Sequence, residues 1–258
     1  MSSIVSVSTA PSAALRQPLV TVATLCWNHS YLIRDFLESF QKQTAPDSLA
    51  EVQMVVVDNG SVDDTPAILE AWCQEAGGPP WKTVVRSPTN LGFAGGANLA
   101  VSQAEGRYLL LLNNDVEFKG DLVKACLQAY PPGCRALLGR KLIHRASPWN
   151  QLHGKTIRYL EGWCLFAPMD VFREVGSFLG ERLVGIFDET FSPAFFEDMD
   201  LSLRAHLAGI ELREVRLPVA HLESRTTKGT PSFDFMDLIY ENQRRFQAKW
   251  RDIAAEAL

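Results

Sequence analysis

Apolar runs and amphipathic segments alternate along the first half of the chain. The runs are rich in β-branched residues or leucine and span residues 19–26, 52–57, 82–86 and a stretch that starts at Tyr108. Short apolar runs bounded by turn-forming residues are typical of strands buried on both faces of a sheet. Apolar residues at helical spacing lie between them, as in residues 28–43. The pattern predicts an α/β fold with one mainly parallel sheet and right-handed crossovers.

The leucine run after Tyr108 ends in a polar triplet, Asn113, Asn114 and Asp115. Ligands of open α/β sheets bind outside the carboxyl ends of the strands, which is where this triplet is expected. A carboxylate there can hold a hard divalent cation that grips phosphate oxygens. The alternative is a simple turn, because Asn and Asp favour turns whatever their function. Asp58 and residues 90–98 follow two further strands, so all three groups are expected to converge at one edge.

Residues 90–98 read NLGFAGGAN and lead into a helix that is predicted to run to about Glu105. Their glycines allow backbone amides to approach a diphosphate at a helix N-terminus. They equally allow close packing of the helix against the sheet. The spacing is not G-x-G-x-x-G and it follows the third strand instead of the first, which argues against a dinucleotide-dependent dehydrogenase.

The second half continues with helical and strand patterns up to the C-terminus. The predicted elements are a helix at 121–130, strands at 136–143 and 164–167, a helix at 197–208, a strand at 210–215 and a terminal helix at 233–258. Residues 1–17 are predicted to form a flexible tail, and residues 18–258 a single domain.

Three acidic residues, Glu197, Asp198 and Asp200, open the predicted helix at 197–208. The helix dipole favours acidic residues at this position, and Asp200 has the spacing of a structural ion pair with Arg204. The functional alternative is that Glu197 or Asp198 is a general base. A lone histidine is usually a packed or surface residue, but neutral His221 could complete a carboxylate metal site.

Composition narrows the classes of function. The chain has 258 residues, 47% of them hydrophobic and 21% charged, as in an ordinary globular protein. Its formal net charge of -5 argues against a general nucleic-acid-binding protein. The five cysteines lack the paired spacing of zinc or redox sites and indicate reduced core residues in a cytoplasmic protein. No secretory signal or membrane-spanning segment is expected.

Six motifs follow one another in a recognisable order: VVVDNGSVDDT, NLGFAGGAN, LLLLNNDV, EGWCLFAP, FFEDMDLSLRAHLAG and PVAHLESRTT. Over residues 19–227 they resemble the inverting family 2 glycosyltransferases, particularly the rhamnosyltransferase-like branch. The resemblance implies a GT-A fold, with a nucleotide-sugar-binding half at 18–118 and an acceptor-binding half with the C-terminal helix at 119–258. It also implies sugar transfer from a UDP- or dTDP-linked donor to a hydroxyl of a glycan, a lipid-linked saccharide or a protein.

The resemblance implies roles for residues on the donor side. Asp58 would recognise the nucleobase, with Trp27 and Asn28 near the same pocket, and Asn113 would face the ribose. The implied donor-binding set is Trp27, Asn28, Asp58, Asn90, Gly92, Asn98, Asn113, Asn114 and Asp115.

On the acceptor side, Asp198 matches the catalytic base of the family, and Trp163 and Glu197 would line the acceptor site. Asp115 would bind a divalent cation, Mn or Mg, that bridges the donor diphosphate. His221 matches a histidine that completes the metal site in many family members.

Two features depart from the family pattern. Asn113 stands where many relatives have Asp, which lowers the negative charge at the metal site. Residues 176–188 are longer than the family pattern, which predicts an insertion beside the acceptor site. Downstream, Arg225 and Lys228 are expected to help neutralise the leaving nucleotide.

Two other classes of function compete with the transferase interpretation. A nucleotidyltransferase would need a glycine-rich basic loop after the first strand, where this chain has LCWNH. A non-catalytic nucleotide- or carbohydrate-binding module predicts binding without turnover, and the intact Asp198 argues against it. A lipid-linked acceptor would draw the enzyme to the inner face of the membrane, although no strongly basic amphipathic stretch demands this.

Overall fold

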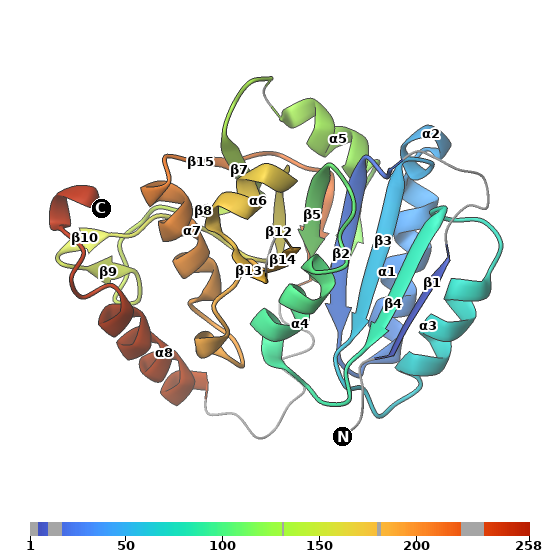
Figure 1. Cartoon of the computed structure of the whole chain (residues 1–258), viewed down its shortest axis with the longest axis horizontal. Coiled ribbons are helices and arrows are strands. Elements are labelled where there is room, and N and C mark those ends of the chain that lie inside the picture. Colours follow the sequence, from blue (N-terminus) through green and yellow to red (C-terminus); the bar gives the residue numbers. More distant parts are fainter. Residues whose placement is uncertain (1–4, 10–16, 131, 180–181, 223–234) are drawn as a thin grey trace.

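The protein is built on one mixed sheet of eight strands (Figure 1). The computed structural model describes residues 5–9, 17–130, 132–179, 182–222 and 235–258. The strands, in spatial order, are β1 (Val5–Thr9), β4 (Trp81–Arg86), β3 (Val52–Asp58), β2 (Val20–Cys26), β5 (Tyr108–Leu112), β12 (Cys164–Pro168), β7 (Ala136–Gly139) and β15 (Glu211–Glu214). Strands β1 and β12 run antiparallel to their neighbours, and the other six share one direction.

Helices cover both faces of this sheet, because alternate residues of the central strands point to opposite sides. One face of β2 and β3, with Val22 and Met54, packs against α1 (Ser30–Gln43), α3 (Thr65–Gln74) and α5 (Leu122–Ala129). The other face, with Ala23 and Val55, packs against α4 (Gly92–Val101), α6 (Met169–Val175) and α7 (Glu197–Leu207). The mainly parallel, doubly covered sheet predicted from the apolar runs is therefore confirmed.

In the described part of the chain, short strands also pair with one another outside the main sheet. Paired short strands are β6 (Val116–Phe118) with β16 (Val219–His221), β8 (Leu142–Ile143) with β11 (Tyr159–Leu160), β9 (Gln151–Leu152) with β10 (Lys155–Thr156), and β13 (Ser177–Leu179) with β14 (Arg182–Gly185). The remaining helical segments are α2 (Pro46–Leu49), η1 (Glu189–Phe191), α8 (Phe235–Lys249) and η2 (Ala255–Ala257). Helix α8 lies at the end of the molecule opposite β1 (Figure 1).

Several boundaries differ from the sequence prediction. The prediction of a flexible tail is wrong for Val5–Thr9, which pairs with β4 as the edge strand of the sheet. The predicted strand at 136–143 is divided between β7 and β8, which belong to different sheets. Helix α4 ends at Val101 instead of near residue 105, and α8 ends at Lys249 instead of continuing to the C-terminus.

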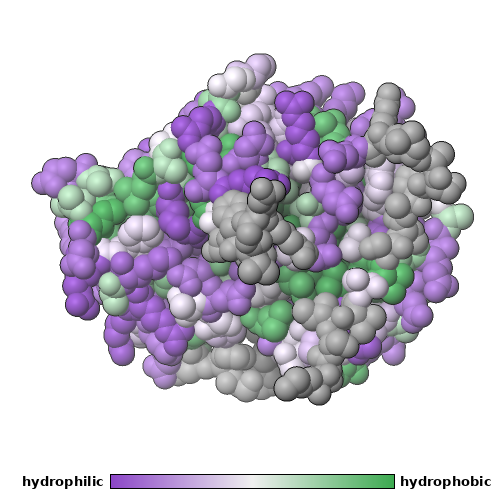
Figure 2. Space-filling model, in the orientation of Figure 1, coloured by the Kyte–Doolittle hydropathy of each residue, from purple (hydrophilic) through white to green (hydrophobic). Residues whose placement is uncertain are grey.

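The molecular surface is mixed in character. On the face shown in Figure 2, hydrophilic residues dominate the periphery, and the exposed hydrophobic residues form small areas. Among the helices of the described segments, none has the length and apolar character that a membrane span requires.

A substitution at Gly96 tests how tightly α4 packs on the sheet. A Cβ atom at this position would lie 2.6 Å from Leu25 Cδ1 and 2.9 Å from Asn59 Nδ2. Alanine is favoured over glycine in a helix by about 1 kcal/mol, but overpacking costs about 1–3 kcal/mol. We expect Gly96→Ala to lower the free energy of unfolding, measured by urea denaturation. Gly120→Ala, where the nearest atom is 3.4 Å away, should be tolerated, and a more stable Gly96→Ala protein would contradict the packing argument.

Candidate active site

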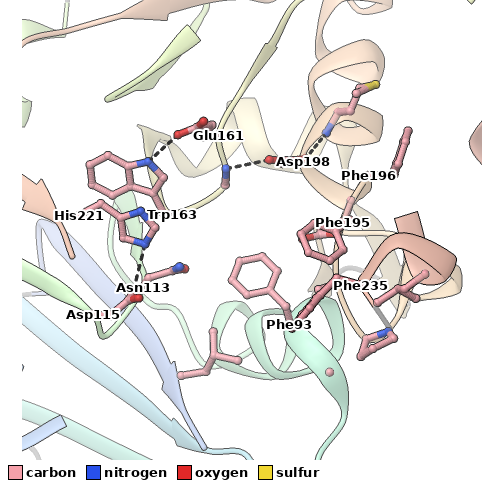
Figure 3. A pocket seen from close by; sticks show the side chains of 18 of the residues that line it. Phe93, Asn113, Asp115, Glu161, Trp163, Phe195, Phe196, Asp198, His221 and Phe235 are labelled. Atoms are coloured by element: carbon pink, nitrogen blue, oxygen red, sulfur yellow. Dashed lines mark hydrogen bonds and ion pairs between the residues drawn. The ribbon is translucent and has the colours of Figure 1, made fainter. Parts of the chain in front are cut away.

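A cavity of about 720 Å³ opens at the carboxyl ends of β2 and β5 (Figure 3). One wall follows the ends of these strands and the start of α4, and it includes Trp27, Asn90, Gly92, Asn113, Asn114 and Asp115. The second half of the chain supplies the other lining residues: Trp163 and His221 lie beside Asp115, and Glu197 and Asp198 line the far side (Figure 3). Ten of the residues predicted from sequence therefore share one cavity, although they are spread over nearly two hundred positions.

Asp115 and His221 form the first polar pair in the cavity. Strand β16 runs antiparallel to β6 with His221 opposite Val116, and the Leu222 amide donates to the Asp115 carbonyl at 2.8 Å. This pairing brings His221 Nε2 to 3.1 Å from Asp115 Oδ1. The imidazole also stacks on the Trp163 ring, with centroids 4.9 Å apart and planes 6° from parallel. The orientation of His221 is thus fixed from two sides (Figure 3).

Asp115 and His221 fit a divalent cation as two of its ligands. They offer one carboxylate and one imidazole, and Mg²⁺-type sites take the remaining ligands from substrate phosphates and water. The neighbouring Asn113 Oδ1 and Asn114 Nδ2 are buried without a hydrogen-bond partner, as expected of groups that meet a ligand. Within the described ranges, no group of three or more His, Cys, Asp or Glu side chains could hold a metal. A cation here would therefore depend on the bound substrate for most of its ligands.

The segment 161–163 connects the two walls of the cavity. It precedes β12, which is antiparallel to β5, so Cys164 lies opposite Leu112 and the segment reaches the carboxyl end of β5. The Trp163 carbonyl accepts a hydrogen bond from the Asn113 amide at 2.9 Å. The Gly162 amide donates to Asp198 Oδ2 at 3.2 Å. Backbone atoms of adjacent residues therefore fix the polar triplet and the candidate base relative to each other.

Side chains of the same segment add polar groups to the cavity. Glu161 accepts a hydrogen bond from Trp163 Nε1 at 3.1 Å and pairs with Lys141 Nζ at 2.6 Å. Sequence reasoning assigned no role to Glu161, Lys141 or Tyr159, all of which line the cavity. The signal that could have found Glu161 is its place beside Trp163 in the EGWCLFAP motif.

Asp198 and Glu197 lie in the first turn of α7. The two oxygens of Asp198 accept hydrogen bonds from the amides of Gly162 and Met199. Burial raises the pKa of Asp198 to about 6, against these bonds, which lower it. Burial, followed by the charge of Asp198, raises the pKa of Glu197 well above its ordinary range, and Glu197 Oε2 has no hydrogen-bond partner. Both carboxyl groups therefore titrate above the range of exposed carboxylates.

The residues before α7 have a strained backbone. Phe195 and Phe196 both have a φ of 75°, in the left-handed region that bulky residues rarely adopt. Such a conformation costs about 1–3 kcal/mol per residue and persists only where the surroundings hold it. Phe196 precedes Glu197 directly, and both phenylalanines line the cavity (Figure 3). Two strained residues thus lie directly before the carboxylates.

Three predicted donor-binding residues do not line the cavity. Asn28 accepts a hydrogen bond from the Val62 amide, and Asp58 accepts one from the Ser61 amide while its other oxygen lies 3.3 Å from Arg86 Nε. Asn98 is buried, and its amide group bonds to the backbone of residues 186–187 and to Glu189. These side chains shape the loops around the cavity.

Two other predicted features can be placed only in part. The longer segment at 176–188 forms the β13–β14 hairpin, and its described residues line a second cavity of about 440 Å³, not the main one. This segment packs against α4 through contacts such as that of Gly185 with Asn98, and its effect on the acceptor site stays a prediction. Arg225 and Lys228 lie outside the described residues.

Comparison with known proteins identifies the family. The family described as Glycosyl transferase family 2 matches residues 21–176, which is more than half of the chain. The chain belongs to glycosyl transferase family 2. The family predicted from the six motifs is therefore confirmed, while the rhamnosyltransferase-like branch stays a prediction.

Relatives with curated descriptions match a part of the chain. The hyaluronan synthase of Pasteurella multocida and the chondroitin synthase of its strain Pm70 are each 30% identical over 115 residues, or 45% of this chain. The match covers 11% of each synthase, so the chain spans about a tenth of the length of these relatives.

Solved structures share the fold at low sequence identity. The mannosyltransferase PcManGT from Pyrobaculum calidifontis, in complex with GDP-Man and Mn²⁺, has a TM-score of 0.63 and 18% identity, over 93% of this chain and 66% of that one. S. aureus TarS 1-349 in complex with UDP-GlcNAc has a TM-score of 0.54 and 18% identity, over 90% and 71%. The predicted GT-A fold is confirmed.

The pH dependence of stability tests whether the pKa of Glu197 is raised in the folded protein. A carboxyl whose folded pKa is raised contributes stability below its unfolded pKa of about 4.3 and loses it as pH rises toward the folded pKa. We expect Glu197→Gln to escape this loss, so the variant should gain stability relative to wild type as pH rises above about 4.3. Urea midpoints at several pH values measure the difference. A difference that is constant with pH would show that Glu197 titrates normally.

Proposed function

We propose that the protein transfers a sugar from a nucleoside-diphosphate sugar to an acceptor hydroxyl with inversion of configuration. The observation that carries the proposal is the Asp115–His221 pair and the Asp198 carboxylate in one cavity, held by the same backbone segment. The first pair suits the charged diphosphate end of a donor, and Asp198 suits proton removal from an acceptor. Family membership supports glycosyl transfer as the reaction.

On the donor side, we assign the diphosphate to the wall formed by Asn113, Asn114 and Asp115. The unpartnered amide atoms of the two asparagines favour contact with ribose and phosphate groups. Trp27, Asn90 and Gly92 complete this wall. We assign the nucleobase to the loops that Asn28 and Asp58 support. Asn98 is proposed to contribute indirectly, through its hydrogen bonds to the backbone of residues 186–187. UDP- and dTDP-linked sugars are the proposed donors.

A divalent cation, Mn or Mg, would be held by Asp115 and His221. When bound, it supplies positive charge that offsets the negative charge of the leaving diphosphate. This proposal is supported by the donor set of the two side chains and by the Mn²⁺ present in the PcManGT complex. Asn113 keeps the site less charged than two adjacent carboxylates would.

In the proposed reaction, Asp198 removes the proton of the acceptor hydroxyl as its oxygen attacks the anomeric carbon. The nucleoside diphosphate leaves from the opposite face of the sugar, so the configuration inverts. A pKa of about 6 suits this role, because the carboxylate is ionised at neutral pH and more basic than an exposed aspartate. The Gly162 amide holds Asp198 Oδ2 at the cavity wall.

The acceptor is proposed to bind between Trp163 and the start of α7, where Glu197 and Phe195 also line the cavity. Its class is a glycan, a lipid-linked saccharide or a protein, and a lipid-linked acceptor would bring the enzyme to the inner face of the membrane.

The alternative function is a non-catalytic nucleotide- or carbohydrate-binding module. The raised pKa of Asp198 favours the enzyme, because a binding module has no need of a basic carboxylate.

The role of Asp198 predicts both a mutational and a pH effect. Asp198→Asn should lower kcat by about 10²- to 10⁴-fold, the usual contribution of a general base, while nucleotide binding is kept. In the wild type, kcat should fall as pH decreases through about 6, where Asp198 becomes protonated. Release of nucleoside diphosphate from a panel of sugar nucleotides measures turnover. Equal losses of turnover and of nucleotide binding in Asp198→Asn would show that Asp198 is structural.

The role of Asp115 predicts metal-dependent nucleotide binding. UDP, dTDP, GDP and CMP are compared by thermal shift, with Mn²⁺ or with chelator. A ligand at a hundredfold its Kd adds about 2.7 kcal/mol, which raises the Tm of a domain this size by about 5–10 °C. One nucleoside diphosphate should give this shift only with Mn²⁺, and Asp115→Ala should abolish it.

Asp47→Ala is the matched control for this experiment, because it removes an exposed carboxylate on α2. It should keep the wild-type shift. A nucleotide shift of the same size in Asp115→Ala, with the same dependence on Mn²⁺, would refute the assigned role.

A further inference from the structure

Asn242 is a polar residue on the buried face of α8. Its side chain is 0% exposed, and it lies at helical spacing between Ile239 and Phe246, which both belong to the apolar cluster under this helix. A buried amide among apolar side chains destabilises a protein unless its hydrogen bonds are satisfied. The partners of Asn242 therefore indicate what it is there to hold.

The amide nitrogen of Asn242 faces three carbonyl groups of one turn. Nδ2 lies 2.7 Å from the carbonyl oxygen of Phe191, 2.8 Å from that of Ala194 and 3.2 Å from that of Phe195. On the other side of the amide group, Oδ1 accepts a hydrogen bond from Arg245 Nη1 at 3.1 Å. The side chain thus fastens the turn at 191–195 to α8.

This turn leads directly into the candidate base. Phe195 and Phe196 hold their left-handed conformation at its end, and the Phe196 carbonyl accepts the amide of Asp200 in the first turn of α7. Strained residues of this kind relax when the contacts that hold them are removed. A relaxed turn would move the start of α7, which carries Asp198 against Gly162.

Other polar anchors of α8 lie beside this contact and further along the helix. Arg245 Nη1 donates to the carbonyl of Thr190, directly before the turn, at 2.6 Å. Lys249 pairs with Asp188 and Asp200 at 2.6 Å and 2.7 Å, and Trp250 Nε1 donates to Asp200 at 3.0 Å. These contacts fix the C-terminal end of the helix. The turn also meets α4, where the Phe93 amide donates to the Pro193 carbonyl at 2.8 Å. Removal of the Asn242 amide therefore leaves α8 docked. It removes the side-chain contacts to the carbonyl groups of Phe191, Ala194 and Phe195, which lie next to the strained residues before α7.

We propose that Asn242 is a positioning residue for the transfer reaction, whose amide holds the 191–195 turn so that Asp198 and the Phe195 ring face the cavity. The inference rests on the proposed role of Asp198 as the base. Asn242 itself does not line the cavity, so it acts through the backbone of the turn.

Two substitutions separate the hydrogen bonds from the packing. Asn242→Ala removes the amide, whereas Asn242→Asp keeps the shape and, in its ionised form, accepts from Arg245 but cannot donate to the carbonyl groups. Asn242→Ser is a milder variant that retains one donor if the other two fold poorly. The matched control is Gln53→Ala, which removes another buried amide that donates to a backbone carbonyl, that of Gln103. Gln53 lies near the amino end of β3, away from the cavity.

The first readout is turnover, measured as release of nucleoside diphosphate from the sugar-nucleotide panel. We expect Asn242→Ala and Asn242→Asp to lower kcat by about 10- to 100-fold, because a displaced catalytic group loses rate steeply with distance. The KM for the donor should change less than kcat, since among the described residues the turn meets the proposed donor wall only at the loop of residues 91–93. Gln53→Ala should keep its kcat even if it is equally destabilised.

The second readout is the titration of Asp198 itself, followed by NMR of protein with ¹³C-labelled aspartate carboxyl groups and assigned with Asp198→Asn. The titratable neighbours that influence Asp198, namely Tyr159, Glu161 and Glu197, are retained in the Asn242 variants. A start of α7 that is freed from the cavity wall should expose Asp198 and lower its pKa from about 6 toward the ordinary value of about 3.9. Gln53→Ala should leave this pKa unchanged.

The two readouts separate failure of the inference from failure of the proposed function. Wild-type kcat and an unchanged Asp198 titration in Asn242→Ala and Asn242→Asp would overturn the positioning role. A proportional loss of kcat in the equally destabilised Gln53→Ala protein would also overturn it. If the wild type releases no nucleotide from any donor, the proposed function fails, but the titration of Asp198 still tests whether Asn242 positions it.

Discussion

Two backbone hydrogen bonds of the segment 161–163 determine the geometry of the cavity. The Trp163 carbonyl binds the amide of Asn113, and the Gly162 amide binds the carboxylate of Asp198. The antiparallel direction of β12 makes this arrangement available, because the start of that strand meets the end of β5. A parallel strand in the same place would present its carboxyl end instead. The polar triplet and the candidate base are therefore held by two adjacent residues, Trp163 and Gly162.

The two walls of the cavity are stabilised in different ways. The proposed donor side follows the ends of buried parallel strands, whose backbone hydrogen bonds fix it. The acceptor-side wall follows the strained pair Phe195 and Phe196 and depends on α8, which lies outside the sheet. Buried Asp200 joins these parts, because it pairs with Arg204 of α7 and Lys249 of α8. The position of the proposed acceptor side therefore depends on side chains of α8 that do not themselves line that wall.

Much of the donor-side wall could be predicted from sequence, because parallel strands bring their polar ends to one edge. Asn113, Asn114 and Asp115 lie there for this reason. Asp58 and Asn98 come from the same region of sequence, but the direction of a side chain depends on turn geometry and on partners such as Arg86. The antiparallel direction of β12 was also not visible in its apolar pattern. Val5–Thr9 joins the sheet although its surroundings in sequence resemble a linker.

The acceptor-side wall was less predictable, because it depends on contacts between distant segments. The Glu197–Asp198 pair was found through its motif, but its raised pKa values arise from burial that the sequence does not display. The role of Asn242 has one sequence signal, an amide within the apolar stripe of a terminal helix. Such a residue identifies a buried hydrogen-bond donor, and only the fold identifies its partners.

The most direct test of the account is the position of Mn²⁺ in crystals grown with UDP, located by its anomalous scattering. We expect a peak bound by the side chains of Asp115 and His221 and by the diphosphate, across the cavity from Asp198. A peak elsewhere, or a nucleotide bound outside the cavity lined by Asn113 and Trp163, would contradict it.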